Sequence, residues 1–381
     1  MTTTPTTPTT DPVARTLVYS CDDHLDLRAV PPTLWESRLP AALREVGPRV
    51  VERDGERVWV CEGRVLGGSG NPPDATLLRS LNAIGRAGID DDGYRAGNAA
   101  LRLQDLDRDG IAASVVYGPL ALGLRMDDPE LMDAGYAAWN DWAVEEFGAV
   151  APDRLSALAF LPSHAPAAAA AELERCAGIG HRGAIIDVFA IDPGDPAWDR
   201  LWGAAADTGL PVSFHLKDGT SSGLRYQVGK WQSAAFATVL PLQLDERIAI
   251  VLFSGVLERN PGLTLVLAES GLGWLPYFLA RSDLEWRELG PKLDYAPKVP
   301  PSELFRDQVY ATFEEDAHAE LFVPMLGADR CMWASDYPHT DSTFPESQRA
   351  IAETLGGLPD ADRHLVVAGN CARLYGFPIP A

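Results

Sequence analysis

The chain has 381 residues, of which 46% are hydrophobic and 23% are charged, and its formal net charge is -22. These proportions are ordinary for a globular protein, and no apolar run reaches the roughly 18 residues that a membrane span needs. Nucleic acid and anionic membrane surfaces are excluded as partners because both require a basic face. On such an acidic protein, an anionic substrate would need a local basic pocket.

The amino-terminal residues 1–15 are predicted to form a disordered tail. The first ten are almost all threonine and proline, with neither the basic region nor the apolar stretch of a secretory signal. The cysteines are odd in number, far apart and without a C-x-x-C pair, which argues against a disulfide framework or a structural zinc site. A cytoplasmic protein with reduced thiols is therefore expected. The cysteines are Cys21, Cys61, Cys176, Cys331 and Cys371.

Short apolar runs, each typical of a strand buried on both faces, recur along the chain. They lie at 16–21, 111–117, 154–161, 183–189, 210–216, 263–269, 308–314 and 329–336. Helical segments are expected between most of them, at 128–147, 166–177, 195–207, 235–259, 274–288 and 316–326. Eight strands that alternate with helices predict an α/β fold, the (β/α)8 TIM barrel, as a single domain over 16–381.

One connection breaks this alternation, because about ninety residues separate the first two predicted strands. A loop of that length is usually functional or a small subdomain. We therefore predict that 28–100 is an inserted cap over the barrel mouth. Within it, residues 50–60 fit a β-hairpin that turns at Asp54-Gly55.

Acid and imidazole side chains follow several of these runs. Asp22 and His24 follow the first run, His215 the fifth, Glu269 the sixth and Asp336 the eighth. Each alone has an ordinary alternative, such as a hydrogen-bonded interior histidine or a turn-capping aspartate. In a barrel, however, the carboxyl ends of different strands meet at one mouth. Two imidazoles with carboxylates suit one divalent ion, for which zinc is expected and manganese is the alternative.

Several longer passages, taken in order, resemble the metal-dependent amidohydrolase superfamily, in the branch named for 2-amino-3-carboxymuconate semialdehyde decarboxylase. The resemblance covers nearly the whole chain after the tail. It implies a metal site made by Asp22, His24, His215 and Asp336, and an alternative register would use Asp26 in place of Asp22. The matching passages are Asp22-Asp23-His24, 195–198 with 209–215, 253–261, 268–271, 335–339 and 369–376.

At Glu269 the chain departs from this branch, whose decarboxylases and carbon-carbon hydrolases usually have a histidine there. An ionised glutamate can only accept a hydrogen bond, so it suits the positioning or deprotonation of a water. This favours a hydrolase that activates water to cleave a C-N or C-C bond in a small carbonyl or carboxylate substrate. Asp336, Glu269 and His339 are the candidate catalytic residues; if Asp336 is the base, Glu269 orients a ligand instead.

Two other functions stay open. One is non-oxidative decarboxylation of an unsaturated or aromatic acid, in which Asp336 delivers the proton. The other is a barrel that binds a ligand without catalysis, against which the intact ligand set argues. The partner in either enzymatic case is a small molecule, and the sequence is compatible with a homodimer.

The remaining polar and aromatic candidates are less specific. His164 lies on the predicted rim, and a basic loop after the fifth strand could bind a carboxylate, although a solvated loop is the simpler interpretation. Two aromatic residues could line the pocket or merely pack beside it. Three other histidines are interpreted as surface or packing residues. The loop residues are Lys217, Arg225 and Lys230; the aromatics are Trp274 and Tyr337; the histidines are His181, His318 and His364.

Overall fold

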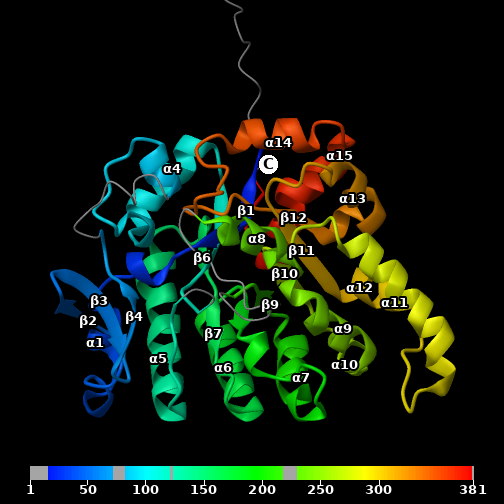
Figure 1. Ribbon diagram of the computed structural model, residues 1–381, viewed down its shortest axis with the longest axis horizontal. Coiled ribbons are helices and arrows are strands. Elements are labelled where there is room, and N and C mark those ends of the chain that lie inside the picture. The colour runs from blue at the N-terminus through cyan, green and yellow to red at the C-terminus, as the bar shows by residue number, and fades with distance from the viewer. Residues whose placement is uncertain (1–15, 72–81, 121–122, 218–229, 380–381) are drawn as a thin grey trace, which may run out of the picture.

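The computed structural model describes residues 16–71, 82–120, 123–217 and 230–379. Parallel strands form a closed barrel in the order of the chain (Figure 1). One sheet contains β1 (Tyr19–His24), β5 (Ala113–Tyr117) and β6 (Leu155–Ala157). The other contains β7 (Ala159–Leu161), β8 (Ala184–Ile186), β9 (Val212–His215), β10 (Leu265–Ala268), β11 (Val309–Phe313) and β12 (Cys331–Trp333).

The two sheets join at both of their edges. Leu158 alone separates β6 from β7, which pair with β5 and β8 respectively, so together they fill the place of one predicted strand. At the other edge the His24 amide donates to Tyr337 O at 2.7 Å and the Asp336 amide to Asp22 O at 3.1 Å. The predicted barrel is confirmed, with a strand in each of the eight predicted ranges.

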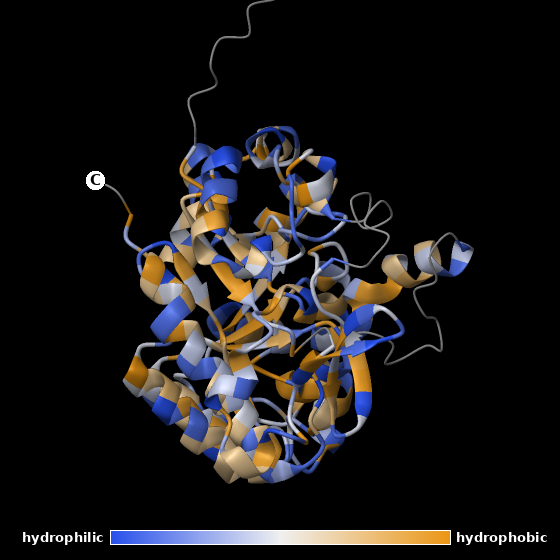
Figure 2. Ribbon diagram, turned by 90° about the vertical axis from the view of Figure 1, so that its left-hand side faces the viewer, coloured by the Kyte–Doolittle hydropathy of each residue, from blue (hydrophilic) through white to orange (hydrophobic). Residues whose placement is uncertain are grey.

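Helices surround the strands, whose apolar residues form the core in Figure 2. The segments predicted at 128–147, 166–177, 195–207, 274–288 and 316–326 each contain a helix, and the prediction missed α1, α3, α4, α12, α14, α15 and α16. The helices are α1 (Leu34–Arg38), α3 (Ala83–Arg86), α4 (Ala99–Asp109), α5 (Pro129–Trp142), α6 (Pro166–Ile179), α7 (Asp199–Thr208), α8 (Trp231–Val239), α9 (Asp245–Phe253), α10 (Val256–Arg259), α11 (Leu275–Leu289), α12 (Pro301–Gln308), α13 (Ala319–Leu326), α14 (Ser347–Leu355), α15 (Asp360–His364) and α16 (Asn370–Tyr375).

The prediction of one continuous helix over 235–259 was wrong. The segment divides into α8, a 3-10 turn at Leu240–Leu244, α9 and α10. Pro241 lies in the 3-10 turn and has no amide hydrogen to donate to a preceding turn. Gly255, between α9 and α10, has a φ of 83°, which ends the right-handed helix. The period-four apolar pattern therefore crosses two breaks in the backbone.

The inserted segment contains a small antiparallel sheet of β2 (Arg49–Arg53), β3 (Glu56–Cys61) and β4 (Arg64–Gly68). The predicted hairpin turn is present, with φ of 53° at Asp54 and 81° at Gly55. Positive φ at both residues matches the twist of the flanking strands. The sheet lies beside α5 and α1 in Figure 1. The extent of the cap, 28–100, stays a prediction.

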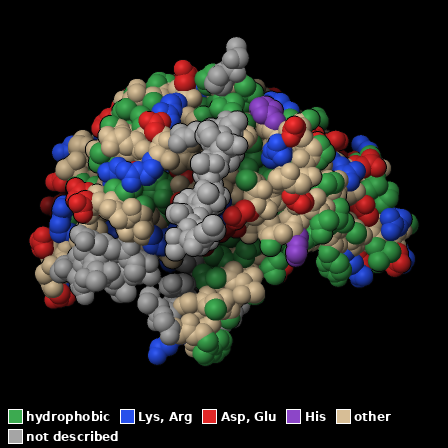
Figure 3. Space-filling model, turned by 90° about the horizontal axis from the view of Figure 1, so that it is seen from above, with side chains coloured by type: hydrophobic (Ala, Val, Ile, Leu, Met, Phe, Trp, Pro, Cys, Tyr) green, Lys and Arg blue, Asp and Glu red, His purple; other side chains and the backbone are tan. Residues whose placement is uncertain are grey.

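The composition also led to expectations about the cysteine thiols and the protein surface. All five cysteines are free and buried. On the described part of the face in Figure 3, basic side chains are interspersed with acidic ones and form no continuous basic surface. Among the described residues, no helix is both long enough and apolar enough to cross a membrane. The predicted tail, 1–15, lies outside the described residues.

Candidate metal centre and active site

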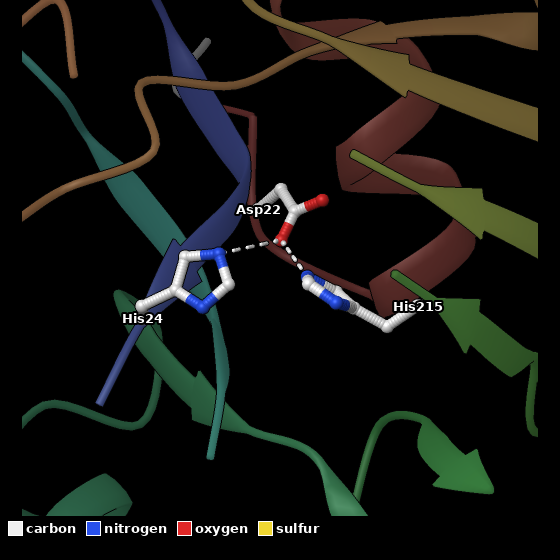
Figure 4. Close-up of side chains that lie close together, drawn as sticks. All are labelled: Asp22, His24 and His215. Atoms are coloured by element: carbon white, nitrogen blue, oxygen red, sulfur yellow. Dashed lines mark ion pairs between the residues drawn. The ribbon is translucent and has the colours of Figure 1, made fainter. Parts of the chain in front are cut away.

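Four of the predicted side chains meet at the mouth of the barrel. The Asp22 carboxylate points between two imidazoles, with Oδ1 3.6 Å from Nε2 of both His24 and His215 (Figure 4). Asp336 Oδ1 lies 2.9 Å from His24 Nε2. All four residues are buried, with at most 4% of each exposed. The strands β1 and β9 and the end of β12 thus bring these groups together across more than three hundred residues of sequence.

The backbone of β1 explains why two ligands come from one short strand. Its pairing with β5 shifts by one residue between Ser20 and Asp23, which is a β-bulge. Asp22 and His24 lie with the other candidate ligands, whereas Asp23 accepts hydrogen bonds from Ser20 Oγ at 2.6 Å and Ser335 Oγ at 2.7 Å. The intervening aspartate therefore joins β1 to β12 and contributes no ligand.

The four side chains fit a bound divalent cation. Asp22 Oδ1, His24 Nε2, His215 Nε2 and Asp336 Oδ1 are buried atoms that form no hydrogen bond within the described residues. Buried polar atoms nearly always have a partner. Two imidazole nitrogens and two carboxylate oxygens are ligands that zinc and manganese accept, so one cation would satisfy all four atoms.

Further contacts orient two of these groups. The Nδ1 of His215 is 2.8 Å from Leu216 O, and its donation there leaves the Nε2 lone pair for a ligand bond. Asp22 Oδ2 accepts from Thr312 Oγ1 at 2.8 Å and from the Glu269 amide at 2.8 Å. Only Oδ1 of that carboxylate is left without a hydrogen bond.

The field at the site attracts positive charge. Burial lowers the pKa of His215, but the Asp22 and Glu269 carboxylates outweigh it and raise this pKa to about 9. The pKa of His24 is well below its usual value because of burial, reinforced by His339 and His215. A neutral His24 can use its nitrogen as a ligand. His24 therefore offers a neutral nitrogen as a ligand, and the carboxylates around His215 favour a bound cation.

Glu269 lies at the edge of the ligand group. Its Oε2 is 3.4 Å from His215 Nε2, and its backbone has a φ of 53°. Burial and the neighbouring Asp336 carboxylate raise the pKa of Glu269 to about 8. The sequence argument for hydrolysis assumed that Glu269 is ionised. Its protein surroundings do not favour the ionised form.

Asp336 and His339 begin a chain of polar contacts that leads toward the surface. Asp336 Oδ1 is 2.9 Å from His339 Nδ1, and His339 Nε2 is 3.3 Å from Asp26 Oδ1. Burial raises the pKa of Asp336 to about 7, although His339 lowers it. Asp26 thus contacts His339 and lies outside the group of Asp22, His24 and His215, which supports Asp22 as the strand-1 ligand.

A pocket of about 470 Å³ opens beside these residues. Glu269 and His339 belong to the wall that the barrel loops form. The inserted segment supplies much of the opposite lining, including Arg28, Asn71 and Asp91. The insertion predicted to be a cap therefore borders the candidate site.

The other polar candidates lie apart from the ligand group or have partners of their own. His164 Nε2 is 2.8 Å from Asp133 Oδ1. The ammonium group of Lys217 is ion-paired with Asp187. Lys230 is exposed at the start of α8, and Arg225 lies outside the described residues. The predicted carboxylate-binding role of this basic loop stays untested.

The aromatic candidates and remaining histidines mostly serve packing. The buried Tyr337 hydroxyl donates to Asp105 Oδ2 at 2.6 Å, so this ring does not line the pocket. Trp274 lines a neighbouring cavity. The ring nitrogens of His181 are within 3.2 Å of two backbone carbonyls, and His181 is buried as a packing residue. His318 and His364 are exposed.

Sequence reasoning missed several residues near the site. Glu314 directly follows β11 and repeats the strand-then-acid pattern, and burial and Asp336 raise its pKa well above the usual value. Thr312 was detectable as a polar residue in an apolar run. Arg102 had no sequence signal, yet it is fully buried and donates to His24 O at 2.8 Å. Arg28 was also missed, although it lines the pocket.

Comparisons with known proteins agree with this geometry. A sequence profile of the family described as Amidohydrolase matches residues 93–377. Gamma-resorcylate decarboxylase from Rhizobium sp. (strain MTP-10005) is 28% identical over 263 residues, which cover 62% of this chain and 74% of the relative.

Two solved structures share the fold. An amidohydrolase from Mycobacterium avium subsp. paratuberculosis K-10 has a TM-score of 0.74 and 19% identity, covering 97% of this chain and 100% of the other. A dihydroxybenzoic acid decarboxylase from Polaromonas sp. JS666 has a TM-score of 0.63 and 18% identity. The alignment covers 95% of this chain and 98% of the other. The latter structure contains manganese and an inhibitor, 2-nitroresorcinol.

Proposed function

Because this chain belongs to the amidohydrolase family, we propose that it is a metal-dependent, non-oxidative decarboxylase of an aromatic or unsaturated acid. The observation that carries the proposal is the group of four buried ligand atoms that form no hydrogen bond within the described residues, in a chain whose curated relatives include decarboxylases. The sequence argument for hydrolysis has no support beyond family membership. The alternative that the same sequence left open is the better supported reaction.

Asp22, His24, His215 and Asp336 would hold one divalent ion, manganese or zinc. The bound ion would supply positive charge that anchors an oxygen of the substrate and draws electron density from it. The pocket walls would position the acid against the ion.

The reaction replaces a carboxylate by a proton. The bond between the ring or alkene carbon and the carboxylate breaks, carbon dioxide leaves, and the electron pair stays on the carbon. Asp336 delivers the proton to that carbon. His339 contacts Asp336 at 2.9 Å and Asp26 at 3.3 Å, so it can return a proton from the pocket side to Asp336. Substrate and proton thus yield carbon dioxide and a product with hydrogen in place of the lost carboxylate, without an oxidant.

The test uses protein stripped with EDTA and reloaded with Mn²⁺ or Zn²⁺. It is incubated without oxygen with 2,6-dihydroxybenzoate and a panel of hydroxybenzoates, benzamides and phenyl ketones. We expect carbon dioxide and the decarboxylated phenol from at least one acid, only in the metal-loaded protein. If amides or ketones are cleaved and no acid releases carbon dioxide, the enzyme is a hydrolase and this proposal is wrong.

A further inference from the structure

The pocket beside the candidate metal centre has an unusual charge balance for an enzyme that accepts acids. Three carboxylates line it, from Asp26, Asp91 and Asp341, together with the carboxyl group of Glu269. Its only lysine and arginine among the described lining residues are Arg28 and Lys217. Carboxylates repel an anionic substrate. An acid that carries more than one negative charge therefore needs a cation in the pocket that is available to it.

Two of the cationic side chains in the pocket already have acidic partners. Lys217 is ion-paired with Asp187, and His339 contacts both Asp336 and Asp26. Arg28 differs, because it forms no ion pair with any residue in the described part of the chain. Arg28 is half-buried, so it is not a fully solvated surface group.

The contacts of Arg28 hold it in place without an ion pair to any described residue. Its Nη1 donates to Gly70 O at 2.7 Å, and the Gly70 amide donates to Arg28 O at 2.9 Å. The guanidinium also lies against Gly68 at the end of β4. A Cβ built on Gly68 would be 2.2 Å from Arg28 Nη2 and 2.5 Å from Cζ. The glycine thus provides the space that the guanidinium occupies.

We propose that Arg28 binds a second carboxylate of the substrate, so that the substrates of this site are dicarboxylic acids. This inference rests on the proposed function, in which the first carboxylate is lost as carbon dioxide. An arginine fork donates two parallel hydrogen bonds to a carboxylate, which a lysine cannot do. The inserted segment would then select the substrate, while the barrel holds the metal ligands.

The experiment measures binding of isophthalate and benzoate to the Mn²⁺-loaded protein by calorimetry. The two probes differ by one carboxylate, and neither measurement depends on turnover. A charge-assisted hydrogen-bond pair predicts that isophthalate binds about 10- to 100-fold more tightly than benzoate. Arg28→Gln should reduce that ratio to within about threefold, and Arg28→Lys should give an intermediate ratio because its charge stays but the fork is lost.

Neighbouring glycines in β4 provide a matched pair of variants. Gly68→Ala places a methyl group where the guanidinium lies, so it should reduce the isophthalate preference as Arg28→Gln does. Gly67→Ala meets no atom within 4 Å and should keep the wild-type ratio. Bound manganese is measured in every variant, and one equivalent in each shows that the metal site is intact.

The outcomes separate this inference from the proposed function. A wild-type ratio near one, or a ratio unchanged in both Arg28→Gln and Gly68→Ala, overturns the role of Arg28 even if carbon dioxide is released from a monocarboxylic acid. An isophthalate preference that both variants abolish supports that role even if no acid tested is decarboxylated. In the second case, the proposed reaction fails and the anion site stands.

Discussion

Two carboxylates at the strand ends have an uncommon backbone conformation. Glu269 has a φ of 53° and Asp336 a φ of 59°. Residues other than glycine enter this region at a cost, and aspartate and asparagine do so more readily than glutamate. The conformation turns each side chain sharply after its strand, toward the ligand group. An amide substituted for Asp336 keeps this backbone and removes only the charge.

We expect Asp336→Asn and His215→Ala to lose metal binding and activity by more than a hundredfold. The reason is that His215→Ala removes a ligand atom and Asp336→Asn removes the negative charge of another ligand, whereas the loss of an outer contact to a ligand alone costs about 10- to 100-fold. Metal content by mass spectrometry and the rate of substrate consumption measure the effect.

His164→Ala serves as the comparison, because His164 contacts Asp133 and belongs to no group of candidate ligands. Its effect should stay within about threefold. Equal losses of metal in all three variants would mean that the ligand group has been assigned incorrectly.

At the scale of elements, the junction of β1 and β12 positions the candidate metal ligands Asp22, His24 and Asp336. Asp23 Oδ1 accepts from Ser20, Ser335 and the Tyr337 amide, while Oδ2 accepts from Ser114 of β5. One carboxylate therefore fixes three strands relative to one another. Arg102 adds its bond to His24 O.

Asp23→Asn should weaken manganese binding by about 10- to 100-fold while the protein still folds. The amide group can accept through only one atom, so either the β12 contacts or the Ser114 contact are lost. The dissociation constant is measured by electron paramagnetic resonance of free Mn²⁺. Asp133→Asn makes the same type of substitution at an exposed aspartate and should leave the dissociation constant unchanged. An unchanged dissociation constant for Asp23→Asn would contradict the role of the junction.

A second contact between elements makes stability depend on pH. Asp109, at the end of α4, accepts from the amide and hydroxyl of Ser347 at the start of α14. Burial raises the pKa of Asp109 to about 6, against 3.8 for the free carboxyl, although Ser347 lowers it. The folded state then binds more protons than the unfolded state between these values. The contribution of Asp109 to the free energy of unfolding is therefore fully present below about pH 4 and is lost as the pH rises through 6.

In Asp109→Asn the side chain resembles the protonated acid, so the variant should not lose this stability as the pH rises. At pH 7.5 the variant should have a free energy of unfolding higher by up to about 3 kcal/mol, which is the pKa difference at 1.36 kcal/mol per unit. At pH 4 the two proteins should be nearly equal. Urea unfolding at both pH values measures the difference, and a variant that is less stable at pH 7.5 would show that the ionised form is favoured here.

The strands were easier to predict from the sequence than the points at which a predicted helix is interrupted. Buried parallel strands are continuous apolar runs, and such runs stand out in the sequence, as the run before His215 shows. The candidate ligands came from the same pattern, and the structure brings their side chains together because strand ends converge. Pro241 and Gly255 interrupt a regular apolar period that alone predicts one helix.

The role of Arg28 could not be predicted in the same way. Its position depends on Gly68 and Gly70, which lie forty residues further along the chain. A contact between a short helical turn and the end of a hairpin has no periodicity that a single sequence displays. The same holds for Arg102, whose partners His24 and Tyr337 lie in different strands or loops.

At the scale of the whole molecule, the candidate metal site would link the stability of the barrel to a bound cation. The four ligand atoms are buried without hydrogen bonds, and the carboxylates among them repel each other. A cation that binds only the folded state stabilises it by about 2.7 kcal/mol at a concentration one hundred times its dissociation constant.

We therefore expect Mn²⁺ to raise the Tm of EDTA-treated protein by a few degrees. Differential scanning calorimetry with and without the ion measures the shift. His215→Ala supplies the control, since it should remove most of the shift; its metal-free Tm is measured as its own baseline, because the variant also loses the ion pairs of His215 with Asp22 and Glu269. A shift of equal size in this variant would place the stabilising ion elsewhere on the acidic surface.

The closure of the barrel between β1 and β12 has a consequence for how the protein is made. Asp22 and His24 are synthesised about three hundred residues before Asp336. Until β12 and the residues after it have been made, the nascent chain lacks one of the four candidate ligands. The complete ligand set can form only afterwards, and a chain that stops before Asp336 would present Asp22, His24 and His215 without the opposing carboxylate. Metal loading can thus report that the first and last strands have met.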